Sequence, residues 1–316
     1  MRAAVLHAYG ETPVVEAFAD PAASDGQSVV DVLAAGLNPI DLRIASGTLA
    51  ARCPVLPSVA GAEGIGRTAD GRRVYFSAPV APYGSFAEQA LIVTDDAVEV
   101  PDGVPDPDAV AYGIAGLAAW LALEHRAQVQ AGETVLVLGA SGTVGAIGVQ
   151  AARLLGAGRV VAAARSQAGL ARAAELGADA TVRIEGDVEA LSRAFREAAG
   201  GDVDVVLDPL WGAPASAALE ALGFHGRLVQ LGQSAGGQAT FSSASVRFSE
   251  LAILGHTNFA SPPERRAAAL RRMWTHAAAG ELHVDCEIVA LDAIADAWRR
   301  QAEGPGRKLV IVPAIG

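Results

Sequence analysis

The sequence predicts an α/β protein in which a doubly wound parallel sheet is joined to a smaller β-rich domain. Three observations support this. Apolar strand-like runs alternate with amphipathic helices from about residue 133 onward. A glycine-rich turn separates the first of these strands from the helix that follows it. The 316 residues exceed the usual length of one domain, roughly 100–200 residues.

The first hundred residues are β-rich and interrupted by Pro, Gly and Asp turns. Short strands are expected at Val29–Ala35 and Ala90–Val93. Residues 100–107, VPDGVPDP, form a turn-rich connector that suits a domain boundary. A single helix is then expected from Asp108 to about His125.

The alternating part that follows predicts a parallel sheet, because strands buried on both faces read as continuous apolar runs. Strands are expected at Thr134–Leu138, Arg159–Ala164, Ala180–Ile184, Asp204–Leu207, Arg227–Leu231 and Leu251–Gly255. Helices are expected at Thr143–Leu155, Leu170–Leu176, Val188–Ala198 and Ala213–Leu222. A helix at Pro263–Ala279 and a strand at Lys308–Val312 are expected to return to the first domain.

Composition excludes several classes of function. The net charge of −11 and the pI of about 5.0 argue against binding to nucleic acids or anionic membranes. No run of about 18 apolar residues is present, and the N-terminal residues lack a signal-peptide pattern. Cys53 and Cys286 lie too far apart for a metal motif, so both are expected to be free thiols. We expect a cytoplasmic protein.

The glycine turn has the spacing G-x-x-G-x-x-G at Gly139, Gly142 and Gly145. Glycines allow a tight turn, close approach of a pyrophosphate, and close packing of helix on strand, while the helix N-terminus attracts phosphate. The predicted contacts with a dinucleotide come from these glycines together with Ser141, Thr143 and Val144. The alternative is a tight turn without a ligand.

The residues after the turn favour NADPH over NADH. An NAD site usually carries Asp or Glu about 20 residues after the glycines, but no acid lies between Glu133 and Glu175. Arg165 stands there and can offer its guanidinium to a 2′-phosphate, with Ser166 as a hydroxyl donor. A solvated surface charge is the alternative for Arg165.

Several segments resemble the zinc-free quinone oxidoreductase branch of the medium-chain dehydrogenase/reductase superfamily. They are Gly36–Asp41 (GLNPID), Pro57–Gly66 (PSVAGAEGIG), Gly84–Glu88 (GSFAE), the glycine turn itself and Gly306–Val310 (GRKLV). The resemblance covers nearly the whole chain. It implies a GroES-like catalytic domain at residues 1–110 and 256–316, divided by a Rossmann domain at residues 111–255.

The same resemblance allows a test for zinc. The zinc alcohol dehydrogenases of the superfamily have Cys at the position of Asn38 and His at the position of Ala62. A catalytic zinc needs about three protein ligands, and here only Glu63 remains. We therefore expect no metal.

Under this resemblance, the candidate catalytic residues are Asn38, Asp41 and Arg43. Asn38 is expected near the nicotinamide as a donor to an enolate oxygen, although it could equally close a turn before Pro39. Asp41 either orients a neighbour or caps a helix. Arg43, where many relatives have Tyr, would favour an anionic oxygen unless it forms a salt bridge with Asp41 or is an exposed charge.

Three further residues complete the expected cofactor site. Leu231 and Gly232 end a predicted strand, and Lys308 begins the last one, where capping the strand is the alternative. Two departures from the branch, Ala118 in place of Thr and Ile184 in place of Tyr, leave the substrate open.

The leading prediction is an NADPH-dependent reductase of quinones or α,β-unsaturated carbonyls, assembled as a homodimer through an edge strand near Leu251–Phe259. A zinc-free ketone or aldehyde reductase is the first alternative, and it would need a proton donor that the sequence does not identify. A non-catalytic NADPH-binding protein is the second, because fold does not fix function.

Overall fold

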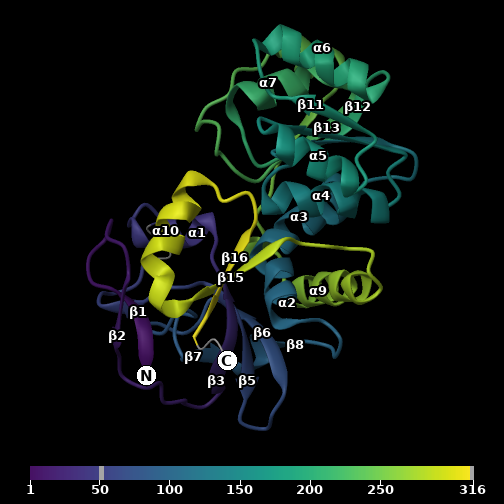
Figure 1. The fold of residues 1–316 in the computed structure, drawn as a ribbon. Helices are drawn as coiled ribbons and strands as arrows, with labels where there is room; N and C mark the ends of the chain where they lie inside the picture. Colours follow the sequence, from purple (N-terminus) through teal and green to yellow (C-terminus); the bar gives the residue numbers. More distant parts are fainter. Residues whose placement is uncertain (50–52, 314–316) are drawn as a thin grey trace. The chain divides into compact units, whose positions relative to one another are not determined.

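A computed structural model of the chain describes residues 1–49 and 53–313. The chain divides into two compact units (Figure 1). Unit 1 comprises Met1–Ile114 and Leu270–Gly316, and unit 2 comprises Ala115–Ala269. The boundaries expected from the sequence were near residues 110 and 255.

Unit 2 is built on a six-stranded sheet in the order β11-β10-β9-β12-β13-β14, and every neighbouring pair is parallel. The strands are β9 (Thr134–Leu138), β10 (Arg159–Ala164), β11 (Ala180–Arg183), β12 (Val203–Asp208), β13 (Leu222–Gln230) and β14 (Ala252–Gly255). This is the strand order of a Rossmann domain. The predicted doubly wound sheet is confirmed.

Helices cover both faces of this sheet, so its central strands are buried. The helices are α4 (Thr143–Leu154), α5 (Gln167–Glu175), α6 (Val188–Ala199) and α7 (Gly212–Ala221), with the short α8 (Ser243–Phe248) before β14. Figure 1 shows α6 and α7 on one side of the strands and α4 and α5 on the other. Local signals set their ends. Asp187 caps α6 through a 2.8 Å hydrogen bond from the Ala190 N–H, and Gly200 ends it with φ 73°.

Unit 1 is β-rich. Its strands are β1 (Arg2–Leu6), β2 (Val14–Ala17), β3 (Gln27–Gly36), β4 (Ser58–Val59), β5 (Glu63–Thr68), β6 (Arg73–Ser77), β7 (Gln89–Val93), β8 (Val98–Glu99), β15 (Cys286–Ala290) and β16 (Lys308–Val312). One sheet has the order β15-β16-β3-β5-β6-β8, with β7 also paired to β3, and a second has the order β2-β1-β4. Short α1 (Pro39–Ala45) follows β3, and α10 (Ile294–Glu303) precedes β16.

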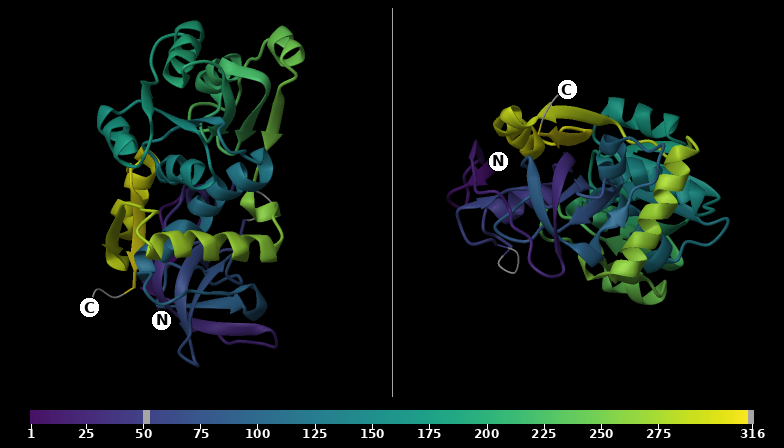
Figure 2. Two further views of the ribbon diagram at one scale, coloured as in Figure 1. Left: turned by 90° about the vertical axis from the view of Figure 1, so that its right-hand side faces the viewer. Right: turned by 90° about the horizontal axis from the view of Figure 1, so that it is seen from below.

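The two ends of the chain meet in this sheet. β16 pairs antiparallel with β3, bringing Val310 opposite Gly36. Figure 2 shows the yellow C-terminal elements beside the purple N-terminal strands. The return of the tail to the first domain, expected from the sequence, is therefore confirmed for the residues described here. The core beneath includes Phe86 and Trp298, packed edge to face with ring centroids 6.5 Å apart.

The predicted helix from Asp108 to His125 is confirmed in its extent, but it is not one regular helix. The segment contains α2 (Asp106–Ala111), a π-helical turn (Tyr112–Gly116), α3 (Leu117–Leu121) and a second π-helical turn (Ala122–Ala127). Gly113, with ψ −114°, departs from helical geometry and kinks the first turn. The apolar pattern could not reveal this break, because residues on both sides of it are buried.

Two elements near the C-terminus, α10 and β15, were not expected from the sequence. Helix α9 (Pro263–Ala278) was expected from the sequence. The second boundary between the units lies within this helix. Within the described ranges, no helix has the length and apolar character needed to cross a membrane.

Candidate functional site

The glycine turn in unit 2 uses each glycine differently. Gly139 has φ +65°, a conformation that side chains disfavour. A Cβ on Gly145 would overlap the carbonyl oxygen of Gly139, so this glycine lets α4 pack tightly against the turn. A Cβ on Gly142 would meet only the Gly139 oxygen, at 3.6 Å, so the space beside it is open. These are the three roles expected of a dinucleotide-binding turn.

The N-terminus of α4 presents donors at this open side. Gly142 is its N-cap and supplies no side chain, so the first-turn N–H groups, including those of Thr143 and Val144, receive no side-chain cap. The helix dipole adds a partial positive charge there. Ser141 packs closely on Gly169 of α5, which fixes the other side of the turn. A pyrophosphate fits this donor set.

The turn also lies where the sheet reverses its strand order. β9 has β10 on one side and β12 on the other, and ligands of doubly wound sheets bind at such a point. A Cβ on Gly139 would meet Leu210 Cδ2 at 3.0 Å, so the loop after β12 borders the turn. Leu231 donates its N–H to the Asp208 carbonyl at 2.9 Å, and Gly232 packs against Pro209. The predicted Leu231 and Gly232 thus follow the next strand at the same edge of the sheet.

Arg165 and Ser166 follow β10 directly. Arg165 is exposed and forms no ion pair with any residue that the structure describes. Ser166 caps α5, since its Oγ accepts a 3.3 Å hydrogen bond from the Gly169 N–H. The Arg165 guanidinium is therefore available to an anion, while the Ser166 hydroxyl already holds a helix end.

Asp208, at the end of β12, is a titratable group that the sequence did not single out. Its side chain is fully buried, and Oδ1 accepts hydrogen bonds from the N–H groups of Leu210 and Trp211, both at 2.8 Å. Burial raises the pKa of Asp208 to about 6, against the lowering effect of these two bonds. Its role is to hold the loop that borders Gly139.

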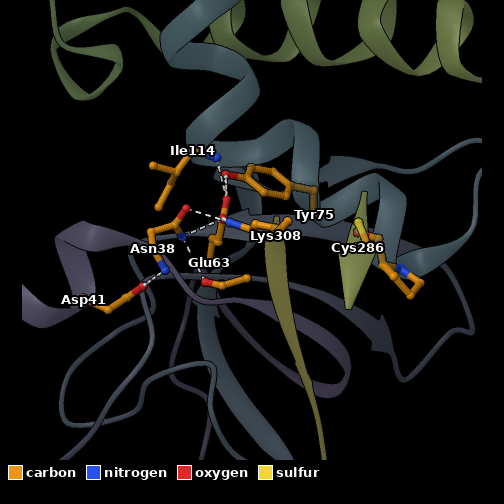
Figure 3. Close-up of polar contacts among 9 residues, drawn as sticks. Asn38, Asp41, Glu63, Tyr75, Ile114, Cys286 and Lys308 are labelled. Carbon is orange, nitrogen blue, oxygen red and sulfur yellow. Dashed lines mark hydrogen bonds and ion pairs between the residues drawn. The ribbon is translucent and has the colours of Figure 1, made fainter. Parts of the chain in front are cut away.

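Unit 1 contains a buried group of hydrogen-bonded residues, the polar cluster, made of Asn38, Glu63, Tyr75 and Lys308 (Figure 3). β5 supplies Glu63, β6 supplies Tyr75 and β16 supplies Lys308, while Asn38 lies between β3 and α1. The Lys308 ammonium donates to Glu63 Oε1 at 2.9 Å and to Asn38 Oδ1 at 2.6 Å. A buried ion pair of this kind needs good geometry to offset its desolvation.

Within the polar cluster, the Asn38 amide is fully committed. Its Nδ2 donates to the Gly36 carbonyl at 2.9 Å and to Glu63 Oε1 at 2.8 Å. An amide nitrogen has two hydrogens, so neither is left for a substrate oxygen in this arrangement. Asn38 therefore has a structural role, which is close to the alternative that it closes a turn before Pro39. Its amide is not free to donate to an enolate oxygen.

Asp41 and Arg43 lie on α1, next to the polar cluster in sequence. Asp41 Oδ2 accepts a 2.8 Å hydrogen bond from the Asn38 N–H, so it caps the helix. Burial raises the pKa of Asp41 to about 7, and the charge of Glu63 adds to this. The suggested salt bridge between Arg43 and Asp41 is absent among the described residues, and Arg43 is exposed.

The donor set of unit 1 does not fit zinc. Ala62 offers no ligand, and the Asn38 amide oxygen is held by Lys308. Glu63 accepts four hydrogen bonds, from Asn38, Lys308, Tyr75 and the Ile114 N–H. An ammonium beside Glu63 would also repel a cation. No group of three potential metal ligands occurs within the described ranges.

The expected site residues thus fall into two groups. The three catalytic candidates and Lys308 come from unit 1, and the rest of the cofactor set comes from unit 2. Tyr75 was missed, and Glu63 was considered only as a metal ligand. Lys308 is the only lysine among 24 lysine and arginine residues, and this is the one sequence feature that could have drawn attention to the cluster.

Comparisons with known proteins agree with this geometry. A family model described as zinc-binding dehydrogenase matches residues 143–275. Quinone oxidoreductase from Homo sapiens is 30% identical over 287 residues, which cover 86% of this chain and 85% of that protein. One phenolphthiocerol/phthiocerol polyketide synthase protein of Mycobacterium tuberculosis is also 30% identical, over 92% of this chain but 14% of the synthase.

Solved structures show the same fold. The quinone oxidoreductase of Thermus thermophilus, also crystallised as its complex with NADPH, is 28% identical with a TM-score of 0.81. The match covers 99% of this chain and all of that one, 100%. The fold is therefore shared with that structure over nearly the whole of this chain.

Proposed function

Since the chain belongs to the medium-chain dehydrogenase/reductase superfamily, in its quinone oxidoreductase branch, we propose that it is an NADPH-dependent, metal-free reductase of quinones or α,β-unsaturated carbonyls. The observation that carries the proposal is the open glycine turn at the switch point of the sheet, with Arg165 free at the end of β10. Relatives named quinone oxidoreductases, one of them crystallised with NADPH, support it.

Residues of unit 2 would hold the cofactor. The N–H groups at the start of α4 would bind the pyrophosphate, and Arg165 would pair with the 2′-phosphate that distinguishes NADPH from NADH. Because no acid lies between Glu133 and Glu175, nothing in that stretch would repel this phosphate. When bound, the nicotinamide supplies the hydride.

Unit 1 would supply the electrostatics. Hydride addition to an enone or quinone places negative charge on an oxygen, which needs donors or positive charge. Because the Asn38 amide is committed, the positive groups of this region are the Lys308 ammonium and the exposed Arg43. Our candidates for the catalytic part of the site remain Asn38, Asp41 and Arg43. The first two would act by holding neighbouring groups in place, through the hydrogen bonds that they form.

The test is turnover across substrate classes. The purified protein is mixed with NADPH and, in turn, a benzoquinone, an enone and a simple ketone, and products are identified by mass spectrometry. We expect NADPH oxidation with the quinone or the enone, and reduction of C=C in the enone. Carbonyl reduction of the ketone alone would instead establish a ketone reductase. Oxidation by none of them, with NADPH bound, would leave a non-catalytic binding protein.

We further propose that the protein is a homodimer formed through β14, because this strand ends the sheet and exposes its backbone. Ile253 is 39% exposed and Phe248 is 71% exposed on neighbouring segments. The strand is shorter than the expected Leu251–Phe259, since Asn258–Ala260 forms a 3-10 turn. A second copy adding its own β14 would continue the sheet.

A further inference from the structure

Glu63 is held from two sides by different parts of unit 1 (Figure 3). Its Oε1 accepts hydrogen bonds from Asn38 Nδ2 at 2.8 Å and Lys308 Nζ at 2.9 Å. Its Oε2 accepts bonds from the Ile114 N–H at 2.6 Å and the Tyr75 hydroxyl at 3.1 Å. The carboxylate is 0% exposed. One side chain therefore joins the candidate catalytic residues to the backbone at Ile114.

Two glycines make room for this carboxylate. A Cβ on Gly36 would lie 2.5 Å from Glu63 Oε1 and 2.8 Å from Lys308 Nζ. A Cβ on Gly113 would overlap Glu63 Oε2 and come within 2.5 Å of the Tyr75 ring. The sequence thus keeps both oxygens of Glu63 in close contact with main chain, which a residue that only fills a core does not require.

The second contact falls at the helix break. Gly113 leaves helical geometry with ψ −114°, and Ile114 follows it. Ile114 is also the last residue of the first segment of unit 1, and Ala115 begins unit 2. The Glu63 carboxylate therefore holds the main chain at the point where it passes from one unit to the other. A charged acceptor makes this hydrogen bond stronger than a bond between neutral groups.

We propose that Glu63 is a positioning residue that couples the Asn38–Lys308 pair to the helix break at Gly113–Ile114, so that cofactor binding in unit 2 and the order of the polar cluster in unit 1 favour each other. This proposal rests on the proposed function, because it takes NADPH as the ligand of unit 2. Coupling between two sites is reciprocal, so loss of Glu63 must weaken the response of each side to the other.

Glu63→Gln tests this coupling. A glutamine can keep its oxygen toward Lys308 and Asn38, but its amide group then faces the Ile114 N–H, which loses its charged acceptor. Tyr112→Phe is the matched control. Tyr112 precedes Gly113 on the same segment, and its hydroxyl donates to the Leu282 carbonyl at 2.8 Å without touching the polar cluster. Each variant removes a buried hydrogen bond from the same stretch of chain, and Glu63→Gln also removes the charge that pairs with Lys308.

The experiment measures amide hydrogen exchange of the peptide spanning residues 112–118, with and without NADP⁺, which cannot donate a hydride. The affinity for NADP⁺ is measured separately by calorimetry. In the unchanged protein, we expect NADP⁺ to slow exchange in this peptide by about fivefold or more. In Glu63→Gln, exchange without ligand should rise on the order of tenfold, and the response to NADP⁺ should disappear.

Tyr112→Phe should keep the response to NADP⁺ even if its basal exchange rises. Kinetics give a second readout: Glu63→Gln should raise KM for NADPH and lower kcat together, which general loss of stability does not predict. The coupling is refuted if NADP⁺ binds the unchanged protein but leaves the peptide unaffected, or if Glu63→Gln responds as the unchanged protein does. Failure of the unchanged protein to bind NADP⁺ would refute the proposed function, and the coupling with it.

Discussion

The Lys308 ammonium lies 2.9 Å from the Glu63 carboxylate, and the two side chains are 2% and 0% exposed. Lys308 is the only lysine in the sequence, and the other 23 of the 24 lysine and arginine residues are arginines. Lys308 packs closely on Gly36, since a Cβ on this glycine would lie 2.8 Å from Lys308 Nζ and 2.9 Å from Cε. This leaves little room for the longer, planar guanidinium of an arginine. A compact cation is therefore built into unit 1.

Replacing the cation tests this pair. Lys308→Met should lower the free energy of unfolding by about 3–5 kcal/mol, because it leaves the Glu63 charge buried without its partner. Glu63→Gln combined with Lys308→Met should recover part of this loss, since both charges are then removed. Urea unfolding followed by circular dichroism measures both. A loss below about 1 kcal/mol in the single variant would mean that the pair carries little energy.

Because the space beside Gly142 is open, a substitution there should weaken cofactor binding without lowering the stability of the fold. Gly142→Ala should leave the free energy of unfolding within about 0.5 kcal/mol, because its Cβ meets only the Gly139 oxygen at 3.6 Å. The same methyl group would occupy the path of the pyrophosphate and weaken NADPH binding by about tenfold or more. Gly145→Ala should impair both properties, because its Cβ would overlap the Gly139 oxygen.

Gly237→Ala is the control for these two variants, as a Cβ there has no neighbour within 4 Å. It should change neither stability nor affinity. Calorimetric titration with NADPH and urea unfolding provide the comparison. If Gly142→Ala bound NADPH as the unchanged protein does, the turn would not be the pyrophosphate site.

Arg165 should decide between the two nicotinamide cofactors. Arg165→Ala removes a charged partner of the 2′-phosphate, so the Kd for NADPH should rise about 10- to 100-fold while that for NADH stays the same. Arg193→Ala removes another exposed arginine of unit 2, on α6, and should alter neither value. Equal effects of Arg165→Ala on both cofactors would show that the guanidinium does not read the 2′-phosphate.

Asp41 should impose a pH dependence on stability. Its pKa is about 7 in the folded protein and 3.8 ordinarily. The folded state thus binds the proton more tightly, and the stability it contributes is lost as pH rises through this window. The slope from this one group reaches about 1.4 kcal/mol per pH unit. Asp41→Asn should flatten the curve by that amount.

Comparing the unchanged protein with Asp41→Asn separates the contribution of Asp41 to stability from that of other groups that titrate in the same pH range. Burial lowers the pKa of His256 to about 4, which makes stability rise with pH, and this contribution is common to both proteins. Thermal unfolding between pH 4 and 8 is the measurement. Parallel curves for the two proteins would contradict a raised pKa of Asp41.

The position of β14 at the edge of its sheet predicts how the homodimer forms. Ile253→Lys places a charge on the exposed side of β14, which is a common way to block pairing of sheet edges. We expect a homodimer for the unchanged protein in sedimentation equilibrium and a monomer for this variant. Ile288→Lys, on an exposed position of unit 1, is the control and should remain dimeric. A monomeric unchanged protein would refute the dimer.

The sequence predicted unit 2 well because its strands and helices carry strong local signals. β9, Thr134–Leu138, and β10, Arg159–Ala164, have the predicted bounds, since continuous apolar runs between glycines mark buried parallel strands. The family motifs then located both units. The strand order could be inferred only through this resemblance.

The polar cluster could not be predicted in the same way. Glu63 and Lys308 are 245 residues apart in the sequence, and their contact depends on β5 and β16 both lying beside β3. No local pattern marks such a pairing. The break at Gly113 was hidden in a similar way, because the Glu63 carboxylate that contacts the next residue, Ile114, lies on a distant strand.

Turnover by metal-depleted protein tests the central claim most directly. The protein is dialysed against a chelator, and the kcat/KM for NADPH and for NADH is measured with a benzoquinone by the absorbance of the reduced nicotinamide. We predict that activity survives chelation and that NADPH is preferred by about tenfold or more. Activity that returns only with added zinc, or the absence of oxidation of either cofactor by quinones and enones, would contradict the account.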